Sequence, residues 1–340
     1  MENSAIITLK KLSLLATILA LVVVSLGAYT RLTHAGLGCP DWPGCYGMLD
    51  VPDTAQQISQ AQQAFPDHDI IPHKAWNEMI HRYFAGSLGL LILVIAFLSL
   101  KYRHYAIPVK LPFFILLLVI FQAALGMWTV TLKLMPVIVM LHLLGGFTTL
   151  CLLFLVYLRL NKSSFLVHDI KVKKYTKFAF LAVIILTLQI ALGGWTSSNY
   201  AALTCTELPI CQSGWFDKLT FSEAFVLIPP EKDSYEFGHL AHNERLTIHV
   251  THRLGAIVTT LYLAWLVLVV FMKAQSKFFQ KSALLLGILL LIQISLGVSN
   301  VWFSLPLAVA VSHNIIAACL MLALIKLVYS LQAKQRTYYE

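Results

Sequence analysis

Eight long apolar segments dominate the sequence and restrict the chain to folds that a lipid bilayer allows. They lie at about 11–30, 79–100, 111–131, 137–158, 178–198, 248–272, 283–303 and 307–329. A run of about 18 or more apolar residues is long enough to cross the hydrocarbon core as a helix. Strands of a membrane barrel would be about ten residues long and would alternate in polarity. We therefore expect an all-α integral membrane protein with eight transmembrane helices.

The composition supports this fold class, because 58% of the 340 residues are hydrophobic and only 12% are charged. Charged residues make up about a quarter of an ordinary soluble domain. The first apolar segment could also be a secretory signal peptide, but no small-residue cleavage site follows it. We expect this segment to be retained as the first membrane span.

The distribution of lysine and arginine predicts the orientation of the chain in the membrane. If the N-terminus is cytoplasmic, most of the 25 basic residues fall on the cytoplasmic side and most of the 16 acidic residues fall outside. Basic residues are enriched in cytoplasmic loops of membrane proteins. We therefore expect both termini in the cytoplasm and the cysteine-containing loops outside. The net charge of +9 follows from this asymmetry and does not indicate nucleic-acid binding.

The sequence contains the same four-helix unit twice. Equivalent residues recur in the same order with matching spacing; the pairs are Thr30 and Thr196, Cys39 and Cys205, Cys45 and Cys211, His81 and His252, Gln122 and Gln293, and His142 and His313. Each unit has an even number of spans, so both copies enter the membrane in the same direction. We expect two tandem four-helix bundles related by a pseudo-twofold axis along the membrane normal.

This repeat divides the chain into three parts. Residues 1–160 would form the N-terminal bundle, 161–177 a basic cytoplasmic linker, and 178–340 the C-terminal bundle. Two long loops, about 32–76 and 199–246, leave the bundles on the outer side. Segment 54–64 is expected to form a surface helix. Segment 215–237 is rich in apolar residues, and either dips into the membrane interface as a lid or packs on the helix ends.

Two histidines in each unit predict a metal site. One of them, His81 or His252, is expected to open the second helix of its unit. The other, His142 or His313, follows 61 residues later and lies about five residues into the fourth helix. Two histidines on facing bundle helices are a common arrangement for haem iron. The alternatives are buried histidines bonded to neighbours, or a zinc or copper site, which two ligands would leave incomplete.

Charged residues accompany the first histidine of each pair. Glu78 precedes His81 by three residues and shares its helix face, so it either complements the helix dipole or lies beside a haem as a catalytic carboxylate. The second copy has His249 at this place, where it could gate or tune the second site. Arg82 and Arg253 could pair with haem propionates or extend to the membrane interface.

Four of the six cysteines lie in the two long loops, as Cys39 and Cys45 and as Cys205 and Cys211. An oxidising exterior permits disulfides there. Each pair is either a structural bridge or a redox-active pair, and the short loop around Cys39 allows the approach that a bridge needs. The other two, Cys151 and Cys319, lie in apolar segments and are expected to be inert.

Together these motifs resemble those of the haem A synthase family, membrane enzymes that oxidise haem O to haem A. The resemblance covers residues 10–330 and rests on the repeat, the four histidines, the Glu-x-x-His-Arg motif at 78–82, and the paired loop cysteines. It implies an enzyme that converts a methyl group of haem O to a formyl group by successive hydroxylations. It also implies a bacterial inner (plasma) membrane location.

The resemblance assigns roles to individual residues. His81 and His142 would be the axial ligands of the substrate haem O iron, and Glu78 the catalytic carboxylate. His252 and His313 would hold a permanent haem b that relays electrons. The disulfide pairs Cys39–Cys45 and Cys205–Cys211 are implied as well, with the first pair implicated in turnover.

The expected partners are the haem O substrate, membrane lipid, haem O synthase and cytochrome oxidase assembly factors, and the pattern is compatible with a homo-oligomer. Three other functions share parts of the pattern. A non-enzymatic dihaem b-type electron carrier would keep both haems unchanged and would not need Glu78. A membrane thiol oxidoreductase would explain the cysteines but not the histidine pairs. A transporter usually has helices broken at midspan, which are not prominent here.

Overall fold

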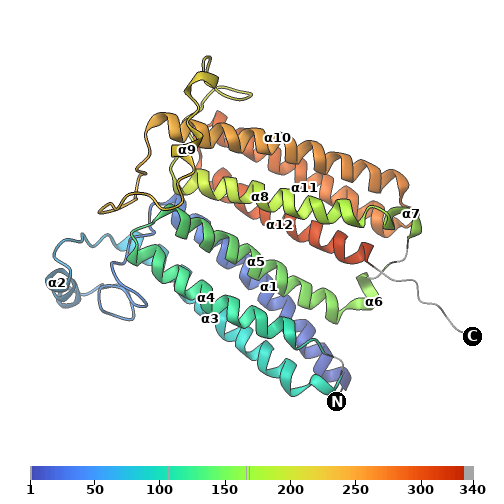
Figure 1. Ribbon diagram of the computed structural model, residues 1–340. Coiled ribbons are helices and arrows are strands. Elements are labelled where there is room, and N and C mark those ends of the chain that lie inside the picture. Colours follow the sequence, from blue (N-terminus) through green and yellow to red (C-terminus); the bar gives the residue numbers. More distant parts are fainter. Residues whose placement is uncertain (1, 106, 166, 168, 333–340) are drawn as a thin grey trace, which may run out of the picture.

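The computed structural model describes the chain except residues 1, 106, 166, 168 and 333–340, so the outermost parts of the predicted domains lie outside the described residues. Eight long helices run side by side in the described part (Figure 1). They are α1 (Glu2–Leu32), α3 (Pro72–Lys101), α4 (Lys110–Thr131), α5 (Pro136–Leu160), α8 (Thr176–Ser198), α10 (His242–Lys273), α11 (Lys277–Trp302) and α12 (Leu307–Leu331).

All eight helices are long and apolar enough to cross a membrane, which confirms a multi-pass membrane protein. No β-strand occurs among the described residues, which confirms the all-α class. The remaining elements are short: α2 (Ala55–Ala64), η1 (Arg103–Tyr105), α6 (Lys162–Phe165), α7 (Ile170–Lys173), η2 (Phe216–Lys218) and α9 (Phe221–Ala224).

Two helices begin well before their apolar segments. Helix α3 starts at Pro72 and α10 at His242, so each adds about two polar turns to the predicted span. Pro72 stands at the first helical position, where its fixed φ angle favours the start of a helix. The prediction that His81 and His252 open their helices is therefore wrong. His81 lies roughly 14 Å along the axis from the helix start, at a rise of 1.5 Å per residue.

The helices pack as two groups of four. In the first group, α1 and α4 each contact both α3 and α5; in the second, α8 and α11 each contact both α10 and α12. The histidine-bearing helices are therefore separated by the other two helices of their group. The groups meet where α1 and α5 pack against α12, and where α5 packs against α8. A buried cluster of aliphatic side chains fills each group.

The two long loops gather at one end of the helices, which we call the disulfide end (Figure 1). Helix α2 lies there and confirms the predicted surface helix. Its N-terminus is closed by a capping box, in which Thr54 accepts from the Gln57 amide and Gln57 accepts from the Thr54 amide. Part of segment 215–237 packs on the helix ends, as one of the two predicted arrangements requires, since Trp215 lies beside Leu246; Ile228 of the same segment is 81% exposed.

Contacts at the disulfide end join the two groups of helices. Arg31 at the end of α1 donates to the Ser197 carbonyl oxygen at 2.5 Å and lies 4.0 Å over the centre of the Tyr200 ring. The Lys74 ammonium lies 3.9 Å from the Glu236 carboxylate. The second loop therefore reaches across to the first group of helices.

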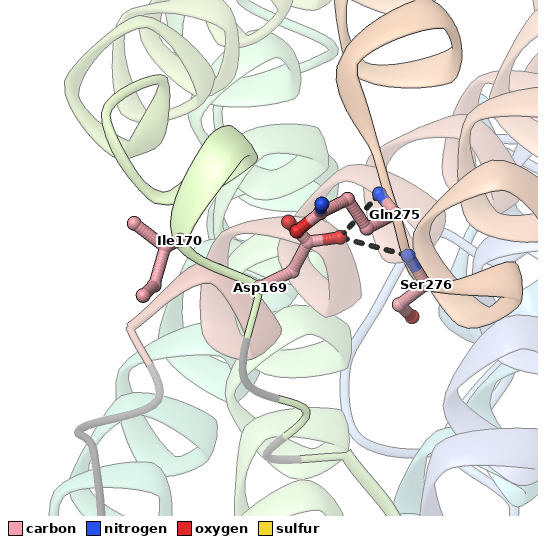
Figure 2. Close-up of a pocket in the computed structure, with 4 residues that line it drawn as sticks. All are labelled: Asp169, Ile170, Gln275 and Ser276. Atoms are coloured by element: carbon pink, nitrogen blue, oxygen red, sulfur yellow. Dashed lines mark hydrogen bonds between the residues drawn. The ribbon is translucent and has the colours of Figure 1, made fainter.

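At the opposite end, Asp169 ties the segment between the two groups to the turn between α10 and α11 (Figure 2). Its buried carboxylate accepts from the main-chain N–H groups of Gln275 (2.8 Å), Ser276 (2.9 Å) and Lys171 (3.2 Å). Hydrogen bonds to a charged group are stronger than neutral ones. One side chain thus fixes the position of this connection.

We predict that Asp169→Ala lowers the free energy of unfolding in detergent by about 1–3 kcal/mol, because it leaves buried N–H groups without an acceptor. Denaturant titration of the purified protein measures the effect. The control is Asp233→Ala, which removes an exposed carboxylate from the second loop. Equal stability of the two variants would show that Asp169 does not fix the connection.

Candidate functional site

The two histidines of the first group face each other between α3 and α5. The ring centres of His81 and His142 lie 6.5 Å apart, with the ring planes at 85°. A metal bonded to two imidazoles at about 2 Å each separates the ring centres by roughly 6 Å. The Nδ1 atoms of both rings are buried and have no hydrogen-bond partner among the described residues. The pair therefore fits one iron held by two axial histidines.

The second group carries the equivalent histidines, His252 on α10 and His313 on α12. His252 Nδ1 lies 3.1 Å from the side-chain nitrogen of Gln189, and His313 Nε2 lies 3.2 Å from that of Gln293. The sequence pointed to the histidines but not to Gln189, whose position in the first unit is taken by valine. The donor set again suits a haem iron, which imidazole ligates well.

A glycine packs against each of the four histidine rings. A Cβ atom placed on the glycine would lie 3.1–3.4 Å from Cε1 of the ring; the pairs are Gly27 and His81 (3.1 Å), Gly126 and His142 (3.4 Å), Gly193 and His252 (3.2 Å), and Gly297 and His313 (3.3 Å). These glycines recur at equivalent places in the repeat, and only the structure shows that they make room for the rings.

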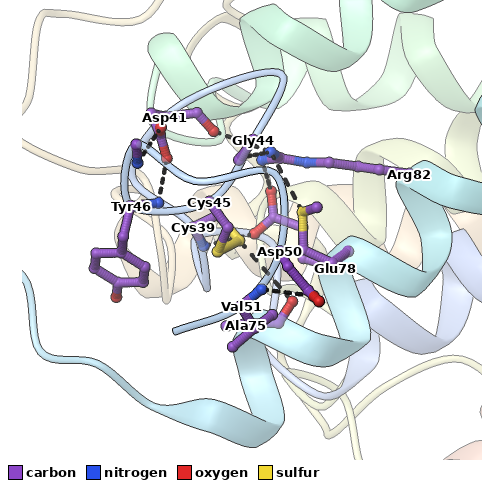
Figure 3. Close-up of a disulfide and its surroundings, with 12 residues drawn as sticks. Cys39, Asp41, Gly44, Cys45, Tyr46, Asp50, Val51, Ala75, Glu78 and Arg82 are labelled. Carbon is purple, nitrogen blue, oxygen red and sulfur yellow. Dashed lines mark hydrogen bonds and ion pairs between the residues drawn. A yellow bond between two sulfur atoms is a disulfide. The ribbon is translucent and has the colours of Figure 1, made fainter. Parts of the chain in front are cut away.

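Glu78 lies under the first disulfide loop (Figure 3). Its side chain is buried, with 5% of the residue exposed, so it is not a solvated helix-start glutamate. One carboxylate oxygen accepts from the Cys39 N–H at 3.0 Å, and the other pairs with the Arg82 guanidinium. The carboxylate therefore lies one turn above His81 on α3 and is held by the loop that covers it.

Arg82 holds the same loop through its main-chain oxygens. It donates to the carbonyl oxygens of Asp41 (3.0 Å), Pro43 (3.2 Å) and Gly44 (Figure 3). From the sequence, haem propionates or the membrane interface are the expected partners of this arginine. The structure places it on the loop carbonyls and on Glu78.

Glu78 and Arg82 together hold the first cysteine loop, and we call such a pair a clamp. The second group contains an equivalent clamp with histidine in place of glutamate. His249 lies between the Cys205 N–H, 3.2 Å from Nδ1, and the Nε atom of Arg253, 3.2 Å from Nε2. Arg253 also donates to the carbonyl oxygens of Glu207 (2.6 Å) and Ile210 (2.5 Å). A neutral imidazole accepts only one hydrogen bond, whereas a carboxylate accepts both. The two clamps therefore differ in charge rather than in layout.

Both loop cysteine pairs lie at disulfide distance, as the sequence predicts. The Sγ atoms are 1.98 Å apart in Cys39–Cys45 and 2.08 Å apart in Cys205–Cys211. Cys39 and Cys45 are fully buried, in a cluster that includes Met79 of α3. The first disulfide is therefore part of the packing above the first histidine pair.

We predict that Gly193→Ala weakens haem binding about tenfold or more, because the added methyl group pushes the His252 ring out of place. The haem content of the purified protein, measured by its absorbance, reports the effect. Gly89→Ala is the matched control, since no heavy atom lies within 4 Å of a Cβ at Gly89. Equal haem content in both variants would contradict the role of the glycine.

We also predict that Arg82→Gln exposes the first disulfide, because the buried Glu78 carboxylate would lose its charged partner at a cost of about 3–5 kcal/mol. A membrane-impermeant reductant followed by alkylation and mass measurement would then detect reduced Cys39 and Cys45. Arg103→Gln, which removes an exposed arginine, is the control. If the double variant Glu78→Gln/Arg82→Gln is equally exposed, loss of the loop contacts is the cause rather than the unpaired charge.

A family model described as cytochrome oxidase assembly protein, COX15-CtaA, matches residues 10–325. The Heme A synthase of Shewanella oneidensis is 53% identical, over 93% of this chain and 94% of the relative. More distant relatives with the same name are those of Mesorhizobium japonicum (26% identical, 88% of this chain and 83% of the relative) and Bacillus licheniformis (24% identical, 92% of both).

Proposed function

The chain belongs to the COX15-CtaA family of cytochrome oxidase assembly proteins, and we propose that it oxidises haem O to haem A in a bacterial membrane. The observation that carries this proposal is the 53% identity to a Heme A synthase over nearly the whole length of both chains. The protein is accordingly an oxidoreductase. An electron carrier or a thiol oxidoreductase is not favoured by this relationship.

The geometry supports different roles for the two histidine pairs. His81 and His142 would hold the substrate haem O, since their ring separation of 6.5 Å suits two axial ligands on one iron. His252 and His313 would hold haem b, and each ring already lies beside a glutamine side chain. When bound, haem b supplies one-electron transfer.

Glu78 is the side chain proposed to act at the reacting edge of the substrate. It lies on the same face of α3 as His81 and carries the negative charge that the second clamp lacks. Its carboxylate would take a proton from a hydroxyl group at this edge or stabilise positive charge there. The buried disulfide Cys39–Cys45 would keep bulk water away from this edge.

In the membrane, the two groups of helices would be bundles related by a pseudo-twofold axis, with 161–177 as a cytoplasmic linker. The disulfide end would face the exterior, because most basic residues lie toward the other end. Haem O would arrive through the lipid phase from a haem O synthase, and assembly factors or a second copy of the chain would be further partners.

We predict that Glu78→Gln binds haem normally but lowers the conversion of haem O to haem A about 100-fold, the usual scale for loss of a general base. Haems extracted from cells that express the variant are identified by mass. Haem O, or a partly oxidised haem, should accumulate.

Glu223→Gln is the matched control, because it removes an exposed carboxylate from α9. Haem A at the wild-type level in Glu78→Gln would exclude the catalytic role. Absence of haem A in cells that express the wild-type chain, with haem O supplied, would overturn the proposed function itself.

A further inference from the structure

We propose that Gln189 and Gln293 are positioning residues that hold the iron-ligating rings of the second histidine pair, and that the first pair lacks such support so that its haem can leave. This inference rests on the proposed function, in which the second pair holds a resident cofactor and the first pair an exchanging substrate. The two glutamines come from α8 and α11, the helices that separate α10 from α12.

Each glutamine amide contacts one ring of the second pair. Gln189 Nε2 lies 3.1 Å from His252 Nδ1 and also donates to the His252 carbonyl oxygen at 3.0 Å. Gln293 Nε2 lies 3.2 Å from His313 Nε2. Both rings of this pair are thus bonded to a side chain of a neighbouring helix.

Only one of the two glutamines has an equivalent in the first unit, and the amide of that residue is turned away from the ring. Gln122 is the equivalent of Gln293, but its Nε2 donates to the main-chain oxygen of His142 at 2.9 Å. A Cβ atom on Gly145 would lie 2.6 Å from the Gln122 amide, so this conformation requires glycine. The equivalent residue in the second unit is Ile316. In that unit Gln293 contacts the ring of His313 instead.

The position of Gln189 also differs between the two units. Gln189 is replaced in the first unit by Val23, which has no hydrogen-bonding side chain. Gly255, whose Cβ would collide with the Gln189 amide, is replaced by Phe84. In the part of the chain that the structure describes, neither His81 nor His142 has a ring nitrogen bonded to a side chain.

The chemistry of a ligated histidine explains what the glutamines would do. When one ring nitrogen binds iron, the other carries a proton, and an acceptor for that N–H fixes the ring and strengthens the ligand. The Oε1 atoms of Gln189 and Gln293 are buried without a partner. A half-turn of the amide would present this oxygen to the ring N–H, and at Gln189 it would replace the hydrogen bond to the His252 carbonyl oxygen. Gln122 Oε1 is also unpartnered, but in the described part of the chain its amide bonds only to the main chain of His142 and not to a ring nitrogen.

The test measures haem retention and reduction potential in Gln189→Leu and Gln293→Leu. We expect haem b to pass to apomyoglobin at least tenfold faster than from the wild type, and its reduction potential to rise, because the ligands become weaker donors. Gln189→Glu, which keeps an acceptor oxygen, should restore slow release. Gln122→Leu is the matched control and should leave the release of haem b unchanged.

A further variant covers the case in which leucine disturbs the fold. Gln293→Glu keeps an acceptor oxygen at the ring of His313. It should restore slow release and the wild-type potential, as Gln189→Glu does at the ring of His252. Unchanged release and potential in both leucine variants would overturn the inference.

His252→Ala separates this inference from the proposed function. If His252→Ala loses the haem b signal while the glutamine variants behave as the wild type, only the inference fails. If His252→Ala keeps the signal, haem b is not held by the second pair, and the proposed assignment of the two sites fails with it.

Discussion

A guanidinium buried at the edge of a membrane needs several acceptors, and the disulfide end is arranged around two such groups. Arg82 and Arg253 each donate to carbonyl oxygens of the cysteine loop of their own unit. A charge left unpaired in such surroundings costs several kcal/mol, so the loops can only be placed where they satisfy these donors. Each arginine directly follows the first histidine of its unit's pair, and this fixes the loop relative to the histidine pair below it.

The two units keep this layout and differ in the residues that complete it. Glu78 and His249 occupy the same place under their loops, and each lies beside the first cysteine and the arginine of its unit. The asymmetry of the protein therefore does not lie in an additional element. It lies in a carboxylate exchanged for an imidazole, and in the residues that surround the rings.

The residues that pack against the four histidine rings are also restricted in type. Four glycines lie against four histidine rings, and a side chain at these places would crowd the ring. Gly145 leaves room for the Gln122 amide beside the main chain of His142, and Gly255 leaves the same room for the Gln189 amide beside His252. The absence of a side chain at these two places thus decides where a glutamine can lie beside a histidine.

The sequence by itself determined the all-α membrane fold, the internal repeat and the pairing of histidines and cysteines, because span length, hydropathy and spacing are local properties of the chain. It placed the start of α3 too late, since the polar turns from Pro72 onward carry no hydropathy signal. Only the tertiary structure decided that Glu78 is buried under the loop, that Arg82 binds loop carbonyls, and that Gln189 reaches His252. These contacts join residues between 38 and 63 positions apart, and their partners depend on how the helices pack.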